Sequence, residues 1–169
     1  CMKDYQSRLN TNVHRGVYSF GDQTSHLYES TRQKTAAFIG ASHPEEIIFT
    51  YGTTDSLNLV AQSLSKAQLC AGDEIILPVS EHHANIVPWQ MIAEEKGVKI
   101  KWIPLTKDQR LDLEKARELF SKRTKILSFS LVSNVLGVIN PAKDLIKMAR
   151  SFNAIVVVDA AQGVPHIKL

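Results

Sequence analysis

The chain has 169 residues and a mass of 18.9 kDa, the size of one domain, which buries about two thirds of its unfolded surface. Its 44% hydrophobic and 22% charged residues are typical of a globular protein and exclude a disulfide-stapled miniprotein. The 20 basic and 17 acidic residues are interspersed and give a net charge of +3, so no nucleic-acid partner is expected. No apolar run is long enough to cross a bilayer, so no membrane partner is expected either.

Short apolar runs alternate with segments of helical periodicity along the chain. A first helix is predicted from about Ser25 to Ile39. Buried strands are predicted at 47–50, 74–79, 98–104, 125–131 and 154–159. Helices between them are predicted around 57–64, 86–93, 113–120 and 142–149. The alternation predicts an α/β fold, a mainly parallel sheet with helices on both faces, and no linker divides residues 1–169.

Ligands of such sheets bind beyond the carboxyl ends of the strands, so the polar residues there are the candidates for a site. Thr53 and Thr54 follow the run at 47–50 and begin the next helix. The free N–H groups of a helix start and the two hydroxyls suit a phosphate. A threonine N-cap is the alternative interpretation.

His82 follows the second run and lies beside His83. Neighbouring histidines point to different sides of the chain, and no HxxxH or HExxH spacing occurs, so no metal site is predicted. His82 is placed either to lie flat on an aromatic ligand or to be an ordinary surface histidine.

Two further strand ends carry polar side chains. Asn134 follows the fourth run, whereas Asp159 ends the fifth and Gln162 comes shortly after it. A carboxylate that caps an apolar strand needs a cation or a strong donor, and this favours a functional role over a structural one. The chain lacks the GxxxxGK[ST] and GxGxxG loops of nucleotide-binding proteins. The combined set suits pyridoxal 5'-phosphate (PLP), which has a phosphate, a flat ring, a ring nitrogen and a phenolic oxygen.

Five strings along the chain resemble those of one enzyme family. They are NVHRG (12–16), FTYGTTDSLNLVA (49–61), EHHANIVPWQ (81–90), VSNVLGVINP (132–141) and VDAAQGVPH (158–166). In this order and spacing they resemble fold-type I PLP enzymes of aminotransferase class V, and within them the SufS-like cysteine desulfurases and selenocysteine lyases.

The resemblance implies a role for each candidate residue. Thr53 and Thr54 would bind the phosphate, and His82 would stack on the ring and assist proton transfer. Asp159 would pair with the ring nitrogen, and Gln162 would contact the phenolic oxygen. Asn134 would face both the cofactor and the substrate carboxylate, and His14 would line the substrate entrance.

The resemblance also implies what the complete enzyme does. It would remove sulfur from L-cysteine, giving L-alanine and an enzyme persulfide for iron–sulfur cluster assembly. It would act as a homodimer that passes sulfur to an acceptor protein. L-selenocysteine is the alternative substrate, and another class V reaction or a non-catalytic scaffold with the same fold is the alternative function. The cysteine usage favours the cytoplasm or an organelle with a reducing interior.

The chain departs from the family pattern at several places. Tyr51 stands where arginine is usual, Leu131 where histidine is common, and Ala160 where glycine is common. The Schiff-base lysine, the persulfide-carrying cysteine and the small C-terminal domain are expected beyond Leu169, so residues 1–169 are expected to be a partial large domain without activity of their own. Neither Cys70 nor Lys168 matches those catalytic positions.

Overall fold

The computed structural model describes residues 2–14 and 18–168, which divide into two compact units. One unit contains the described residues up to Phe49, together with Lys168, and the other runs from Thr50 to Ile167. Cys1, and Arg15 and Gly16 of the first family string, lie outside the described residues. In the part of the chain described, no helix combines the length and the apolar character needed to cross a membrane.

The first unit is built on a long helix. Helix α2 (Ser19–Ile39) begins before the predicted Ser25 and ends at Gly40, whose positive φ of 74° suits a glycine C-cap. The sequence did not predict the short helix α1 (Met2–Arg8), which buries none of its residues. The unit also contains a 3₁₀ turn, η1 (Pro44–Glu46).

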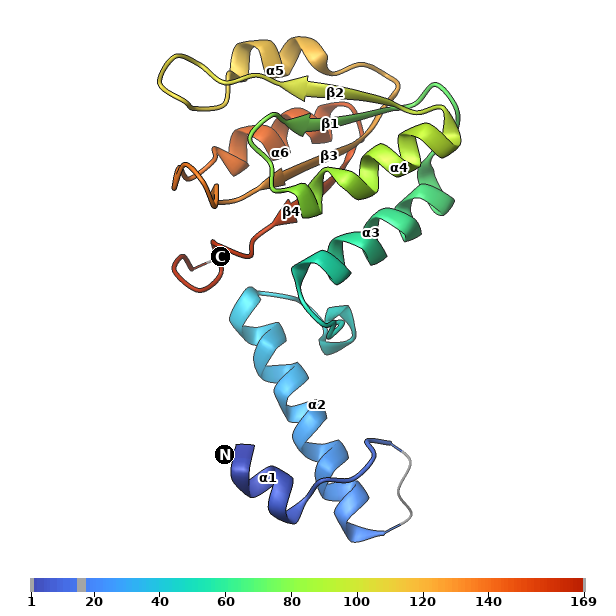
Figure 1. The fold of residues 1–169 in the computed structure, drawn as a ribbon, viewed down its shortest axis with the longest axis vertical. Coiled ribbons are helices and arrows are strands. Elements are labelled where there is room, and N and C mark those ends of the chain that lie inside the picture. The colour runs from blue at the N-terminus through green and yellow to red at the C-terminus, as the bar shows by residue number, and fades with distance from the viewer. Residues whose placement is uncertain (1, 15–17, 169) are drawn as a thin grey trace. The chain divides into compact units, whose positions relative to one another are not determined.

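The second unit contains a four-stranded parallel sheet (Figure 1). Its strands are β1 (Glu74–Pro78), β2 (Lys99–Ile103), β3 (Thr124–Ser130) and β4 (Ile155–Asp159). The strand order is β2-β1-β3-β4, and every neighbouring pair is parallel. The expected α/β class is confirmed, and β1 pairs with both β2 and β3.

One predicted strand is wrong. Residues 47–50 form no strand in the described chain, although Ile47 has extended dihedral angles of −92° and 120°. Apolar, β-branched residues favour an extended backbone, but a strand also requires a neighbour for its N–H and C=O groups. The local sequence therefore predicted an extended backbone at Ile47 correctly, but not a paired strand.

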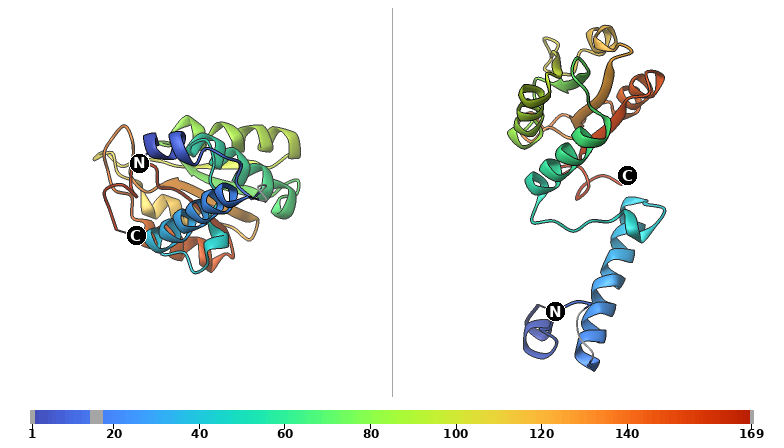
Figure 2. Two further views of the ribbon diagram at one scale, coloured as in Figure 1. Left: turned by 90° about the horizontal axis from the view of Figure 1, so that it is seen from below. Right: turned by 90° about the vertical axis from the view of Figure 1, so that its right-hand side faces the viewer.

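Helices cover both faces of the sheet, as the two further views in Figure 2 show. Helices α3 (Thr53–Gln68) and α4 (Val87–Lys96) pack on one face, whereas α5 (Leu113–Leu119) and α6 (Ala142–Ser151) pack on the other. Side chains along β1 point alternately to the two faces of the sheet, so this strand contributes to the hydrophobic core on each face. Ile75 and Leu77 face α3 and α4, while Ile76 faces the opposite side. Since all strands are parallel, their carboxyl ends share one edge of the sheet, where a ligand site is expected.

Candidate functional site

A cavity of about 150 Å³ lies at the carboxyl ends of β3 and β4 and at the start of α3. It lies wholly within the second unit. Every residue that the family resemblance assigns to the cofactor lines it. The lining residues are Thr53, Thr54, His82, Ala84, Ser130, Val132, Asn134, Asp159, Ala161 and Gln162.

The threonines lie in the first turn of α3 and not at its N-cap. The N-cap is Gly52, whose φ of 135° is a conformation that glycine adopts readily, and no side chain caps this helix end. The alternative interpretation of a threonine cap is therefore wrong. Thr53 and Thr54 are exposed at the start of a 16-residue helix, whose unpaired N–H groups and partial positive charge favour an anion.

A short turn fixes the ring of His82. His82 is the N-cap of the 3₁₀ turn η2 (His83–Asn85), and its Nδ1 accepts a hydrogen bond from Ala84 N–H at 3.1 Å. Because Nδ1 accepts, a neutral His82 carries its proton on Nε2. His82 and His83 are both exposed, and their ring planes lie at 78°. His82 forms part of the wall of the cavity.

Asp159 is the last residue of β4 and is only 8% exposed. Its Oδ1 accepts a hydrogen bond from Ala161 N–H at 3.0 Å. Among residues 2–14 and 18–168, no lysine, arginine or histidine forms an ion pair with this carboxylate. A buried carboxylate of this kind is suited to a cationic ligand group, which would supply the missing positive charge.

Asn134 and Gln162 reach the cavity from turns that follow β3 and β4. Asn134 is exposed in a turn that Ser133 stabilises, since Gly137 N–H donates to Ser133 C=O and Leu136 N–H to Ser133 Oγ. Gln162 is exposed in a turn closed by the Gly163 N–H bond to Ala160 C=O. Both amide side chains can therefore donate to an oxygen of a ligand without losing a partner in the fold.

Behind the cavity lies a buried carboxylate, Glu81, whose role the sequence did not reveal. Glu81 is 8% exposed and accepts hydrogen bonds from Ser130 and Asn85. Burial raises the pKa of Glu81, and the nearby charge of Asp159 raises it further, against the lowering effect of those hydrogen bonds. Sequence analysis did not single out Ser130, which lines the cavity, although a serine near the carboxyl end of the predicted strand at 125–131 was a usable signal.

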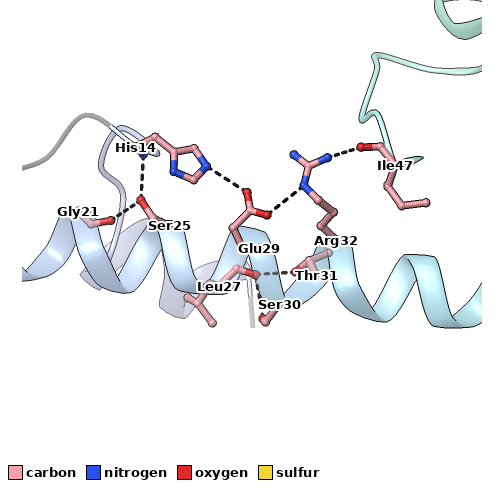
Figure 3. A network of polar contacts seen from close by, with 9 residues as sticks. All are labelled: His14, Gly21, Ser25, Leu27, Glu29, Ser30, Thr31, Arg32 and Ile47. Carbon is pink, nitrogen blue, oxygen red and sulfur yellow. Dashed lines mark hydrogen bonds and ion pairs between the residues drawn. The ribbon is translucent and has the colours of Figure 1, made fainter. Parts of the chain in front are cut away.

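His14, expected at the substrate entrance, belongs to the first unit. Its Nε2 lies 3.0 Å from Glu29 Oε1, and Glu29 Oε2 accepts from Arg32 Nε at 3.1 Å (Figure 3). The His14 backbone N–H donates to Ser25 Oγ at 2.9 Å. Arg32 also donates to the Ile47 carbonyl and thereby holds this network in place. The placement of His14 beside the substrate stays a prediction.

Cys70 and Lys168, which do not match the catalytic positions of the family, do not line the cavity. Cys70 is an exposed free thiol in the connection that enters β1, at the end of the strand opposite the cavity. Lys168 belongs to the first unit and does not line the cavity.

Comparisons with known proteins agree with the architecture. Residues 1–169 match the aminotransferase class V family over their whole length. The chain is 46% identical over 168 residues to the "Probable cysteine desulfurase" of Halalkalibacterium halodurans, covering 99% of this chain and 41% of that protein. It is 43% identical over 172 residues to the protein of the same name from Streptomyces coelicolor, again covering 99% and 41%.

Solved structures show the same similarity. The apo cysteine desulfurase of Thermococcus onnurineus NA1 superposes with a TM-score of 0.93 at 41% identity, over 99% of this chain and 41% of that one. The cysteine desulfurase CsdA of Escherichia coli superposes with a TM-score of 0.87 at 37% identity, over 98% of this chain and 42% of that one. The chain thus spans about two fifths of the length of these relatives. With a parallel α/β fold, a strand-end cavity and a match along its entire length, this chain belongs to the aminotransferase class V family.

Proposed function

We propose that this chain forms the PLP-binding part of a cysteine desulfurase. The observation that carries the proposal is the cavity that Asp159 shares with Thr53, Thr54 and His82. An acid without an ionic partner among the described side chains, an exposed imidazole ring and a helix start meet there. The acid suits the ring nitrogen of PLP, the imidazole suits its ring face, and the helix start suits its phosphate.

The residues fit the cofactor group by group. The first turn of α3, with the hydroxyls of Thr53 and Thr54, would bind the phosphate dianion. His82 would stack on the ring, because the Ala84 N–H bond holds its imidazole while the side chain stays exposed at the cavity. Asp159 would accept a charge-assisted hydrogen bond from a protonated ring nitrogen.

The chemistry follows from these contacts. When bound, PLP supplies an electron sink for breaking bonds at the α-carbon of an amino acid. Asp159 would sustain that sink, because its negative charge would keep the ring nitrogen protonated. Because Nδ1 is used as an acceptor, Nε2 is the atom of His82 that would take part in proton transfer at the bound cofactor. Asn134 and Gln162 orient the ring and the substrate by donating to their oxygen atoms.

The names of the relatives support the choice of reaction and substrate. The relatives from Halalkalibacterium halodurans and Streptomyces coelicolor are named as probable cysteine desulfurases, so L-cysteine is the proposed substrate, with alanine and an enzyme persulfide as products. Transfer of the sulfur to an acceptor protein for iron–sulfur cluster assembly and the homodimer are further parts of the proposal. The expected cellular compartment stays a prediction.

The test uses the complete gene product that carries these residues. We expect the purified protein to be yellow, to contain PLP, and to release alanine and sulfide from L-cysteine in the presence of a thiol reductant. L-Selenocysteine, assayed in parallel, separates a desulfurase from a selenocysteine lyase by the ratio of kcat/KM. A folded protein that binds no PLP would contradict the proposal and leave a scaffold role.

A further inference from the structure

We propose that Glu81 is a positioning residue that fastens the loop carrying His82 to the end of β3, a role that rests on the PLP site proposed above. Glu81 immediately precedes His82 and does not line the cavity. Its carboxylate points instead into a buried polar network that connects the loop with β3 and α4.

The carboxylate of Glu81 is surrounded by donors. Its Oε1 accepts from Ser130 N–H at 2.9 Å, and its Oε2 accepts from Ser130 Oγ at 2.6 Å and from Asn85 Nδ2 at 2.7 Å. Short contacts of this kind are typical of an ionised acceptor. Only a carboxylate offers acceptors on both oxygens, so the environment selects the acid over its amide.

The other half of the network fixes the amide of Asn85. Asn85 Oδ1 accepts from Ser128 Oγ at 2.6 Å and from Trp89 Nε1 at 3.2 Å. Because these bonds define which atom is the oxygen, Asn85 must present its NH₂ group to Glu81. Asn85 and Trp89 are at most 1% exposed, so water cannot replace a lost partner.

Two residues of this network, Ser130 and Asn85, are bonded to or paired with residues of the proposed site. Ser130, held by Glu81, is the register partner of Asp159 in the pairing of β3 with β4. Asn85 ends the η2 turn of which His82 is the N-cap, and its backbone N–H donates to His82 C=O at 2.8 Å. One carboxylate therefore fixes the spacing between the ring that would stack on PLP and the strand end that would pair with its nitrogen.

Buried charge at this place has a cost that a purely structural role does not explain. Burial and the charge of Asp159 both raise the pKa of Glu81, so its ionised form is disfavoured. A neutral side chain would avoid that repulsion, and buried ionic groups are often replaceable without loss of stability. A requirement for accurate geometry at the site accounts for the acid.

The test compares three variants of the complete protein: Glu81→Gln, the exchange Glu81→Gln with Asn85→Asp, and Glu74→Gln. In either orientation of its amide, the first variant places an NH₂ against a donor, the NH₂ of Asn85 or the backbone N–H of Ser130. The exchange restores a donor–acceptor match and keeps one negative charge. Glu74 is the matched control because it is also 8% exposed and hydrogen-bonded but lies at the opposite end of β1.

We expect Glu81→Gln to weaken PLP binding about tenfold or more and to change the visible circular dichroism of the bound cofactor. The exchange is expected to restore affinity to within about threefold of the parent and to recover that signal, allowing for incomplete repacking. Glu74→Gln should alter thermal stability without altering either readout. Parent-like affinity and dichroism in Glu81→Gln would overturn the inference, as would losses of equal size in the Glu74 control.

The experiment distinguishes failure of this inference from failure of the proposed function, and it provides for a variant that does not fold. If the parent protein binds no PLP, the proposed function fails, whereas failure of the inference alone leaves the parent spectrum intact. If Glu81→Gln does not fold, Asn85→Ala takes its place, because it removes one donor to Glu81 and Asn85 does not line the cavity. PLP affinity equal to that of the parent in Asn85→Ala would then overturn the inference.

Discussion

Replacing Asp159 by asparagine is expected to weaken PLP binding without unfolding the protein. In the structure, Asp159 Oδ1 accepts from Ala161 N–H at 3.0 Å, and the backbone C=O of Asp159 accepts from Leu131 N–H at 2.8 Å. An asparagine keeps both bonds, because its amide oxygen can occupy the Oδ1 position. What it loses is the negative charge.

The magnitude follows from the bond that is lost. A hydrogen bond to a charged group contributes about 1.5–3 kcal/mol, so the affinity for PLP should fall by a factor of about 10–150. The amide NH₂ can only donate to the ring nitrogen, which then stays unprotonated, so kcat should fall as well. Stability should be unchanged or slightly higher, since Asp159 is 8% exposed and its charge raises the pKa of Glu81.

The assay is a PLP titration of the complete apoprotein, followed by absorbance, with chemical denaturation of each variant in parallel. Glu118→Gln is the control, because Glu118 is an exposed acid near the end of α5 and does not line the cavity. Equal PLP affinity for the parent and Asp159→Asn would refute the reasoning. So would an affinity loss that Glu118→Gln reproduces.

Three other predictions test the cavity and the fold. Thr54→Val should weaken binding of PLP, measured by titration, but not of pyridoxal, which lacks the phosphate, and equal losses for both would contradict a phosphate site at α3. Gly163→Ala places a Cβ 2.6 Å from Leu131 Cδ2 and should lower the free energy of unfolding, measured by chemical denaturation, by about 1–3 kcal/mol. This loss of stability should be smaller when Leu131 is also replaced by alanine. If the effects of the two substitutions simply add, the contact is not the cause. Burial by itself raises the pKa of Glu74. Hydrogen bonds from Lys101 Nζ, 2.8 Å away, and from two hydroxyls, together with the positive charge of Lys101, bring this pKa below its ordinary value of 4.5. The ionised Glu74 therefore stabilises the fold above pH 4.5, so Glu74→Gln should be about 1–3 kcal/mol less stable than the parent at pH 7. This difference in stability should shrink as the pH falls below 4.5. A difference that does not change with pH would contradict the lowered pKa of Glu74.

The strand ends of the site were predictable because burial leaves a strong local signal. The runs that became β1 and β4 are nearly continuous in apolar residues, and the acid after the last run stands out against them. Parallel pairing then places such ends on one edge whatever the details of the loops. That inference accounts for the common cavity of His82 and Asp159. It does not account for Thr54, which follows residues 47–50 and lines the cavity from the first turn of α3.

What the sequence could not show depends on partners that are distant along the chain. Residues 47–50 have strand-like composition, but composition does not supply a neighbouring strand. The threonines at α3 were possible caps until the dihedral angles of Gly52 placed the N-cap one residue earlier. Glu81 lies in a polar string and gives no sign that Ser130, 49 residues later, supplies its hydrogen bonds.

The most direct measurement is a crystal structure of the complete protein grown with PLP. The account predicts the phosphate at the first turn of α3 beside Thr53 and Thr54, the ring against His82, and its nitrogen within hydrogen-bonding distance of Asp159. Density for PLP at another place, or a ring nitrogen that faces away from Asp159, would contradict it.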